Sequence, residues 1–187
     1  DAEDDQYYGI YVYGGYNSIT NLIEGCSVQI TGKIGYYYGS LQITDINSDS
    51  QISILSPVDK NQIVTREEKI SNIDDIYAYS KIGSLVTLHN LTVYDYNDSQ
   101  NNSATTLKCH YIDENGNQKQ FNVRIAKEIA LYDPITKKQI SSGEYFVGKT
   151  FETITGMLAY YNGADKTPYS NGHMQLALSS MDDVIFK

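Results

Sequence analysis

Short runs of alternating apolar and polar residues, separated by glycine-rich or polar turns, dominate this chain. In residues 9–15, Ile10 and Val12 take one face while Tyr11 and Tyr13 take the other. A period of two is typical of a β-strand with one buried face. The pattern therefore predicts a protein built from strands.

The same pattern places the other elements. Asn115-Gly116 predicts a tight hairpin, because these residues accept the positive φ of a primed turn. A shift of alternation at His89-Asn90 predicts a bulge or bend. A capping residue at Ser71 predicts a short helix over 71–79. Strands are predicted over residues 26–30, 32–38, 41–46, 51–55, 84–93, 105–112, 120–125 and in a hairpin over 150–179, with an apolar anchor at 182–186.

One hairpin occurs twice. Residues 31–39 and 155–163 each hold an apolar run, a glycine, an aromatic cluster and a turn glycine. Each copy is followed by a further strand, at 41–45 and at 174–178. A repeat of this kind predicts two related modules.

The order of elements in the second module indicates its fold. Two long strands, a tight hairpin, a connection and a final hairpin form the order of the five-stranded Greek-key barrel called the OB-fold. We therefore expect an all-β protein with two OB-like barrels in tandem, the first lacking its first two strands. The expected division is an acidic tip at 1–6, a partial module at 7–56, a linker at 57–70 and a complete module at 71–187. Either the sequence begins inside a module or another segment, in this or a second chain, covers the open edge.

Charge, tyrosine content and the cysteines limit the kinds of ligand and the compartment that can be expected. The 187 residues carry a net charge of −9, which opposes attraction to phosphate backbones. Tyr is abundant at 18 and Trp is absent; tyrosine suits half-buried sheets and wet binding faces. Cys26 and Cys109 are expected to be separate buried thiols. No apolar run has the length of a membrane span, so we expect no membrane insertion.

Two stretches carry a family resemblance. GIYVYGG at residues 9–15 and LIEGCSVQITGKIGYYYGSLQITD at 22–45 resemble the second half of OB-fold modules in secreted and surface-attached Gram-positive proteins, some of which accompany extracellular nucleases. Residues 73–93, 121–125 and 145–178 resemble a whole copy. The resemblance implies a non-catalytic ligand-binding module of a larger extracellular or cell-surface bacterial protein. Oligonucleotide binding is expected first, carbohydrate binding is the alternative, and a structural, adhesive or protein-interaction role comes third.

Site residues follow from the same resemblance. OB-folds bind on the face of their second and third strands and on the adjoining loops. Aromatic rings beside cations suit single-stranded nucleic acid, and the same rings can stack on sugars. The alternative is that these aromatics only pack the sheet. The candidates are Tyr11, Tyr13, Lys33, Tyr36, Tyr37 and Tyr38 in the first module, and Lys108, His110, Asn122, Arg124, Tyr160, Tyr161, Tyr169 and His173 in the second.

The sequence gives no support for a metal site or a phosphate-binding loop. The three histidines, at 89, 110 and 173, are scattered, so no metal-ligand motif is present. Acids at Asp45, Asp49 and 95–98 have the oxygen ligands that calcium prefers, but their turn-forming tendency is the favoured explanation for them. Residues 143–150, which end in Gly148-Lys149-Thr150, resemble a phosphate loop but open a strand instead of the helix that such a loop requires, so we reject that assignment. We therefore expect no enzyme activity, no metal and no cofactor.

Overall fold

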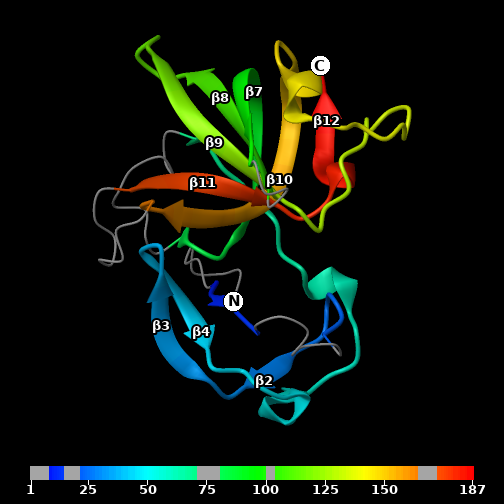
Figure 1. Ribbon diagram of the computed structural model, residues 1–187. Coiled ribbons are helices and arrows are strands. Elements are labelled where there is room, and N and C mark those ends of the chain that lie inside the picture. The colour runs from blue at the N-terminus through cyan, green and yellow to red at the C-terminus, as the bar shows by residue number, and fades with distance from the viewer. Residues whose placement is uncertain (1–8, 15–21, 71–80, 100–103, 164–171) are drawn as a thin grey trace.

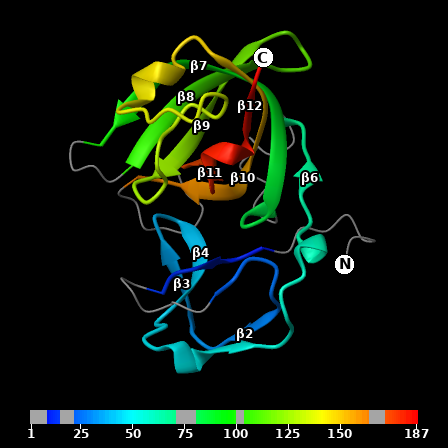
Figure 2. The ribbon, with the colours of Figure 1, turned by 90° about the vertical axis from the view of Figure 1, so that its right-hand side faces the viewer.

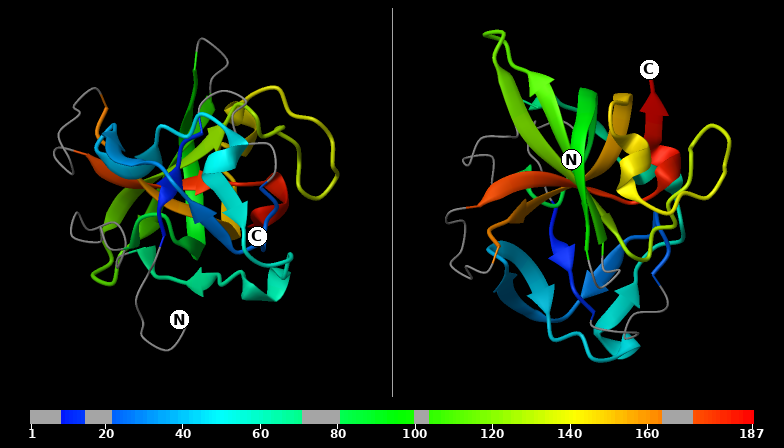
Figure 3. Two further views of the ribbon diagram at one scale, coloured as in Figure 1. Left: turned by 90° about the horizontal axis from the view of Figure 1, so that it is seen from below. Right: turned by 45° about the horizontal axis from the view of Figure 1, so that its top comes forward.

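The computed structural model describes residues 9–14, 22–70, 81–99, 104–163 and 172–187, and these residues form strands and short 3-10 helices. Five strands close into a barrel (Figures 1 and 3). They are β7 (Leu85–Asp98), β8 (Ala104–Ile112), β9 (Gln118–Ala126), β10 (Thr150–Tyr161) and β11 (His173–Leu178). The ring runs β7-β8-β9-β11-β10 and returns to β7, with β9 and β11 parallel and the other neighbours antiparallel. The all-β class is confirmed, and the closed barrel fits an OB-like fold.

Alternation explains the core of the barrel. On β8, Leu107, Cys109 and Tyr111 point inward and are at most 8% exposed. On β9 every second residue from Phe121 to Ile125 is buried in the same way. Their polar neighbours face outward, which leaves one face of β8 and β9 available to a ligand.

Turn chemistry explains the connection between β8 and β9. Gly116 has a φ of 81°, a value that glycine tolerates without strain. The Asp113 carboxylate accepts hydrogen bonds from the backbone N–H groups of Asn115 and Asn117, at 2.9 and 2.8 Å. The predicted hairpin is confirmed. The predicted irregularity in β7 is confirmed as well, because Asn90 has a φ of 60°.

The C-terminal tail packs against one side of the barrel. β12 (Val184–Phe186) pairs with β10 after the 3-10 helix η6 (Met181–Asp183). Phe186 stacks on Phe151 with ring centroids 5.4 Å apart, and both rings contact Phe146 from η5 (Gly143–Phe146). The tail therefore serves as the apolar anchor that its sequence predicts.

The first region is a smaller assembly. β1 (Tyr11–Val12), β4 (Ser40–Thr44) and β3 (Lys33–Tyr37) form one sheet in that order, with β1 parallel to β4. β2 (Val28–Ile30) pairs with β5 (Ile52–Ile54), which follows the 3-10 helix η1 (Asp49–Gln51). The β3–β4 hairpin lies beneath the β10–β11 hairpin in both side views (Figures 1 and 2).

The expected linker at 57–70 is partly a barrel element. After η2 (Lys60–Gln62), β6 (Arg66–Glu67) runs parallel to β7. Ile70 is only 5% exposed and belongs to the barrel core. The last residues of the expected linker are therefore attached to the barrel by β-pairing and apolar burial, while the division of the chain into modules stays a prediction. The acidic tip at 1–6 and the helix predicted at 71–79 lie outside the described residues.

Candidate ligand-binding surface

A line of polar and aromatic side chains crosses from the first region onto the outer face of the barrel. We call it the polar–aromatic strip. Its successive members are in contact or opposite one another across a strand pair. The strip consists of Tyr37, Tyr38, Tyr161, His173, Asn122 and Lys108.

The tip of the β3–β4 hairpin positions the first two tyrosines. Tyr38 and Gly39 both have left-handed backbones, with φ of 47° and 80°. The Asn162 N–H donates to the Tyr38 carbonyl at 3.1 Å, which ties the tip to the end of β10. A Cβ on Gly39 would lie 2.5 Å from Nδ2 of Asn162 and 2.9 Å from Cε1 of Tyr160. Glycine therefore allows the two hairpin tips to approach closely.

The rings form a chain of tilted contacts. Tyr37 and Tyr38 have centroids 4.3 Å apart with planes at 69°. Tyr38 and Tyr161 follow at 5.5 Å and 50°, and Tyr161 and His173 at 5.9 Å and 70°. Such tilted arrangements are the favoured geometry of aromatic pairs. The rings therefore offer a row of tilted contacts instead of one flat platform.

A hydrogen bond continues the strip across the barrel. Asn122 Nδ2 lies 3.0 Å from His173 Nε2. Because an amide nitrogen donates, the imidazole nitrogen accepts, which requires a neutral ring. Partial burial lowers the pKa of His173, so the imidazole is uncharged at neutral pH. This part of the strip is polar without being cationic.

The lysines predicted for the site are both ion-paired. Lys108 Nζ lies 2.6 Å from Asp95, and the hydrogen bond raises the pKa of Lys108 and lowers that of Asp95. Lys33 Nζ lies 2.7 Å from Asp45, and this hydrogen bond likewise raises the lysine pKa. Arg124 is exposed on β9, next but one to Asn122. The cations on this face are therefore largely matched by carboxylates.

The structure separates the other predicted residues from the strip. Tyr160 is 3% exposed and its hydroxyl accepts a hydrogen bond from the Gly172 N–H at 2.9 Å, so its ring belongs to the core. Tyr11 in β1 and Tyr13 just after it are 43% and 44% exposed. The His110 ring lies 6.0 Å from that of Tyr94. Tyr36 is 46% exposed on the opposite face of β3 from Tyr37, and Tyr169 lies outside the described residues.

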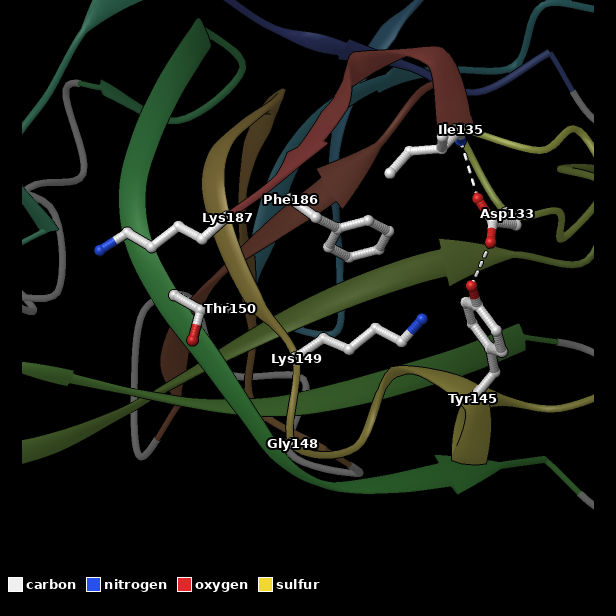
Figure 4. Close-up of a pocket in the computed structure, with 8 residues that line it drawn as sticks. All are labelled: Asp133, Ile135, Tyr145, Gly148, Lys149, Thr150, Phe186 and Lys187. Atoms are coloured by element: carbon white, nitrogen blue, oxygen red, sulfur yellow. Dashed lines mark hydrogen bonds between the residues drawn. The ribbon is translucent and has the colours of Figure 1, made fainter.

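Apart from the strip, the barrel has a cleft on another side (Figure 4). This cleft of about 550 Å³ is bounded by the start of β10, by β12 and by the connection at 127–143. Lys149 Nζ lies 3.4 Å above the Tyr145 ring and 5.2 Å from the centre of Phe186. The sequence did not reveal this cleft, because its residues come from three segments with no shared motif.

The acid in the cleft has a structural role. The Tyr145 hydroxyl and the backbone N–H groups of Thr136 and Ile135 all donate to Asp133, as two dashed lines in Figure 4 indicate. These hydrogen bonds, led by that of Tyr145, lower the pKa of Asp133 to about 2. The carboxylate is therefore ionised and occupied in holding the loop.

The acids considered for calcium also have protein partners. Hydrogen bonds from Thr105, Ser142 and the Gly143 N–H outweigh the effect of burial and lower the pKa of Asp98. Across the described ranges, no group of three or more His, Cys, Asp or Glu residues is placed to hold a metal ion. No helix in that part of the chain is long and apolar enough to cross a membrane. Cys26 and Cys109 are both free, and burial raises the pKa of Cys109 to about 12.

Scans of family models, curated proteins and solved structures each returned no significant match. The fold assignment therefore rests on the strand topology, and the resemblance to Gram-positive OB modules stays a prediction.

Proposed function

We propose that the protein is a non-catalytic binding module of a larger extracellular protein, and that its polar–aromatic strip binds an extended oligosaccharide. One observation carries the proposal. The strip combines contacting, partly exposed tyrosine rings with neutral hydrogen-bonding groups, while its lysine is paired with Asp95 at 2.6 Å.

Sugars have both features that such a strip recognises. Their C–H faces pack on aromatic rings, and their hydroxyls exchange hydrogen bonds with amide and imidazole groups. Tyr37 is 59% exposed and supplies a ring, while Asn122 and His173 supply polar atoms at the other end of the strip. An extended row of rings and polar groups matches a chain of sugar units better than it matches one sugar ring.

Charge is the reason for preferring a neutral ligand. Affinity for nucleic acid comes largely from lysine and arginine contacts to phosphate. Here Asp95 and Asp45 neutralise the two lysines, and the whole chain carries −9. A phosphate approaching Lys108 would also approach a carboxylate.

Single-stranded oligonucleotide is the second candidate. It is favoured by Arg124, which is exposed on the β8–β9 face beside rings that could stack on bases. The two candidates differ in their response to salt. Oligonucleotide affinity should fall as salt rises, and substituting Arg124→Gln should reduce that slope by about one. Oligosaccharide affinity should be nearly independent of both changes.

A thermal-shift screen followed by titration tests the proposal. The protein would be screened against bacterial and plant oligosaccharides and short single-stranded DNA and RNA, since a ligand of the folded state raises the melting temperature. Tyr161→Ala and Tyr37→Ala should weaken the hit by about tenfold, or ~1.4 kcal/mol. Tyr13→Ala is the matched control, because Tyr13 is 44% exposed but does not belong to the strip.

Each outcome has a meaning. A glycan hit lost in the strip variants and kept in Tyr13→Ala supports the proposal. A nucleic-acid hit with a steep salt dependence replaces it with the second candidate. No shift with any ligand favours the third expectation, a spacer or protein-interaction module.

We also propose that the first region is the second half of another OB-like barrel. Its sheet order β1-β4-β3 has the parallel and antiparallel pairings of β9-β11-β10. β5 pairs with β2 after a 3-10 turn, as β12 pairs with β10. Gln42 and Gln175 occupy matching positions, and both are buried at 6% and 7% exposure.

Backbone details support the same correspondence. Gly25 and Gly148, with φ of 90° and 84°, precede β2 and β10. The N–H of Cys26 donates to the Ile23 carbonyl at 3.2 Å, as that of Lys149 donates to Phe146 at 3.0 Å. At the other end, Leu55 donates to Ser27 at 2.8 Å and Lys187 donates to Thr150 at 3.0 Å. The shared backbone pattern adds to the sequence repeat of residues 31–39 and 155–163.

A further inference from the structure

The strand registers relate each residue of the first region to a residue of the closed barrel. Ile34 lies opposite Ile43 as Leu158 lies opposite Leu176. Val12 lies opposite the same Ile43, as Val123 lies opposite Leu176. Side chains opposite one another in a sheet share a face. The face that holds Val12, Ile34 and Ile43 therefore corresponds to the inside of the barrel.

Burial differs sharply between the two copies of this face. Leu158 is 0% exposed, whereas Ile34 is 65% exposed. Tyr160 and Phe121 are 3% and 2% exposed, whereas the corresponding Tyr36 and Ile10 are 46% and 38% exposed. At the rim, Phe146 is fully buried and its counterpart Ile23 is 58% exposed. The first region thus presents apolar residues that the complete barrel buries.

The closed barrel indicates what covers this face. There, β8 pairs with the free edge of β9, and β7 pairs with both β8 and β10. In the first region, within the described ranges, β1 has a strand neighbour only in β4, and β2, which corresponds to the part of β10 that pairs with β7, has one only in β5. The elements without a counterpart are therefore β7 and β8. Together they form an antiparallel pair that turns Val86, Leu88, Leu91, Val93, Leu107, Cys109 and Tyr111 toward the core.

We propose that this open apolar face, defined by Ile10, Val12, Ile34, Tyr36 and Ile43, binds a β-hairpin of a partner polypeptide. The hairpin adds one strand to the edge of β1 and a second beside β2 and the start of β3, and its alternate apolar side chains fill the space that β7 and β8 fill in the barrel. Main-chain hydrogen bonds give such strand addition its affinity, and alternate side chains give it specificity. The inference goes beyond the ligand proposed for the strip and does not depend on it.

A second copy of this chain is a poorer occupant. Its own β7–β8 pair is locked in its barrel, where Val86, Leu88, Leu91 and Val93 are 0% exposed. Donating that pair would open a complete core to close an incomplete one. An apolar small molecule is also a poor match, because it would leave the backbone groups of the strand edges without partners.

The test uses the intact protein and a peptide with the sequence of residues 84–112. Hydrogen exchange measured by mass spectrometry should slow by about tenfold or more over 10–13 and 28–34 when the peptide is added. A control peptide with serine at the seven inward positions should give no protection. The host variant Ile34→Lys should also abolish it, since a charge would then lie in the filled core.

A fused chain removes the dependence on peptide solubility. A copy of residues 84–117 placed before Tyr7, in place of residues 1–6, keeps the spacing that joins β8 to β9, because Ile10 corresponds to Phe121. The fusion should raise the melting temperature and protect the same amides, and the serine-substituted fusion should not. If neither the peptide nor the fusion protects these amides, or if the serine controls protect them equally, the proposal is overturned.

Discussion

Replacement of Gly39 by alanine probes the contact between the first region and the barrel. Gly39 has a φ of 80°, and a left-handed backbone costs a residue with a Cβ about 1 kcal/mol. The added Cβ would also lie 2.5 Å from Nδ2 of Asn162 and 2.9 Å from Cε1 of Tyr160. Both neighbours are buried, so they have little room to move, and overpacking of this kind costs about 1–3 kcal/mol. Gly39→Ala should therefore lower the free energy of unfolding by about 2–4 kcal/mol.

Gly116→Ala is the matched control for this variant. Gly116 has a φ of 81°, and a Cβ there would meet nothing within 4 Å. It should lose only the backbone contribution of about 1 kcal/mol. Urea denaturation followed by tyrosine fluorescence measures both variants, and equal slopes would show that they differ in stability alone. Equal losses in the two variants would refute a close packing of Gly39 against the barrel.

Three further predictions concern titration and reactivity. The hydrogen bonds to Asp133 lower its pKa to about 2, so its contribution to stability is present above the ordinary value of 3.8 and is lost as pH falls toward 2. The melting temperatures of the native protein and of Asp133→Asn should therefore converge between these pH values. A constant difference between the two proteins would contradict the assignment. Burial lowers the pKa of His173, so ligand affinity should stay constant from neutral pH to below 6.5 and fall only when the ring protonates and loses its hydrogen bond from Asn122. His173→Gln should remove this pH dependence. The same loss of affinity at low pH in the variant would disprove the role of this ring. Cys109 is fully buried, and burial raises its pKa to about 12. A thiol reagent should therefore label Cys26 in the folded protein and reach Cys109 only after unfolding, which peptide mapping by mass spectrometry would show. Labelling of Cys109 in the folded protein would mean that the barrel opens.

Much of the barrel was predictable from local pattern. Alternation in 105–112 and 120–125 identifies the inward residues correctly, because the buried face of a two-sided strand repeats every second residue. Asn115-Gly116 identifies the turn between them for a local reason. The role of 66–70 was not predictable, because β6 and Ile70 are attached to the barrel by contacts with distant strands.

The candidate surface was predictable only in part. Tyr160 and Tyr161 are adjacent in a strand, so one must face inward, and the choice of Tyr160 follows from its register opposite Met174. The Asp95–Lys108 pair depends on a register shift between Val93 and Asp95 that the sequence does not specify. The contact of Tyr38 with Tyr161 depends on how two hairpin tips meet, which no single strand encodes.

Mapping of the bound ligand by NMR tests the central proposal most directly. The 21.0 kDa chain is small enough for amide chemical shifts to be followed while the oligosaccharide with the largest thermal shift is added. The proposal predicts that the shifts concentrate at Tyr37, Tyr38, Asn122, Tyr161 and His173. Shifts confined to the cleft around Asp133 and Lys149, or no shifts with any oligosaccharide, would contradict it.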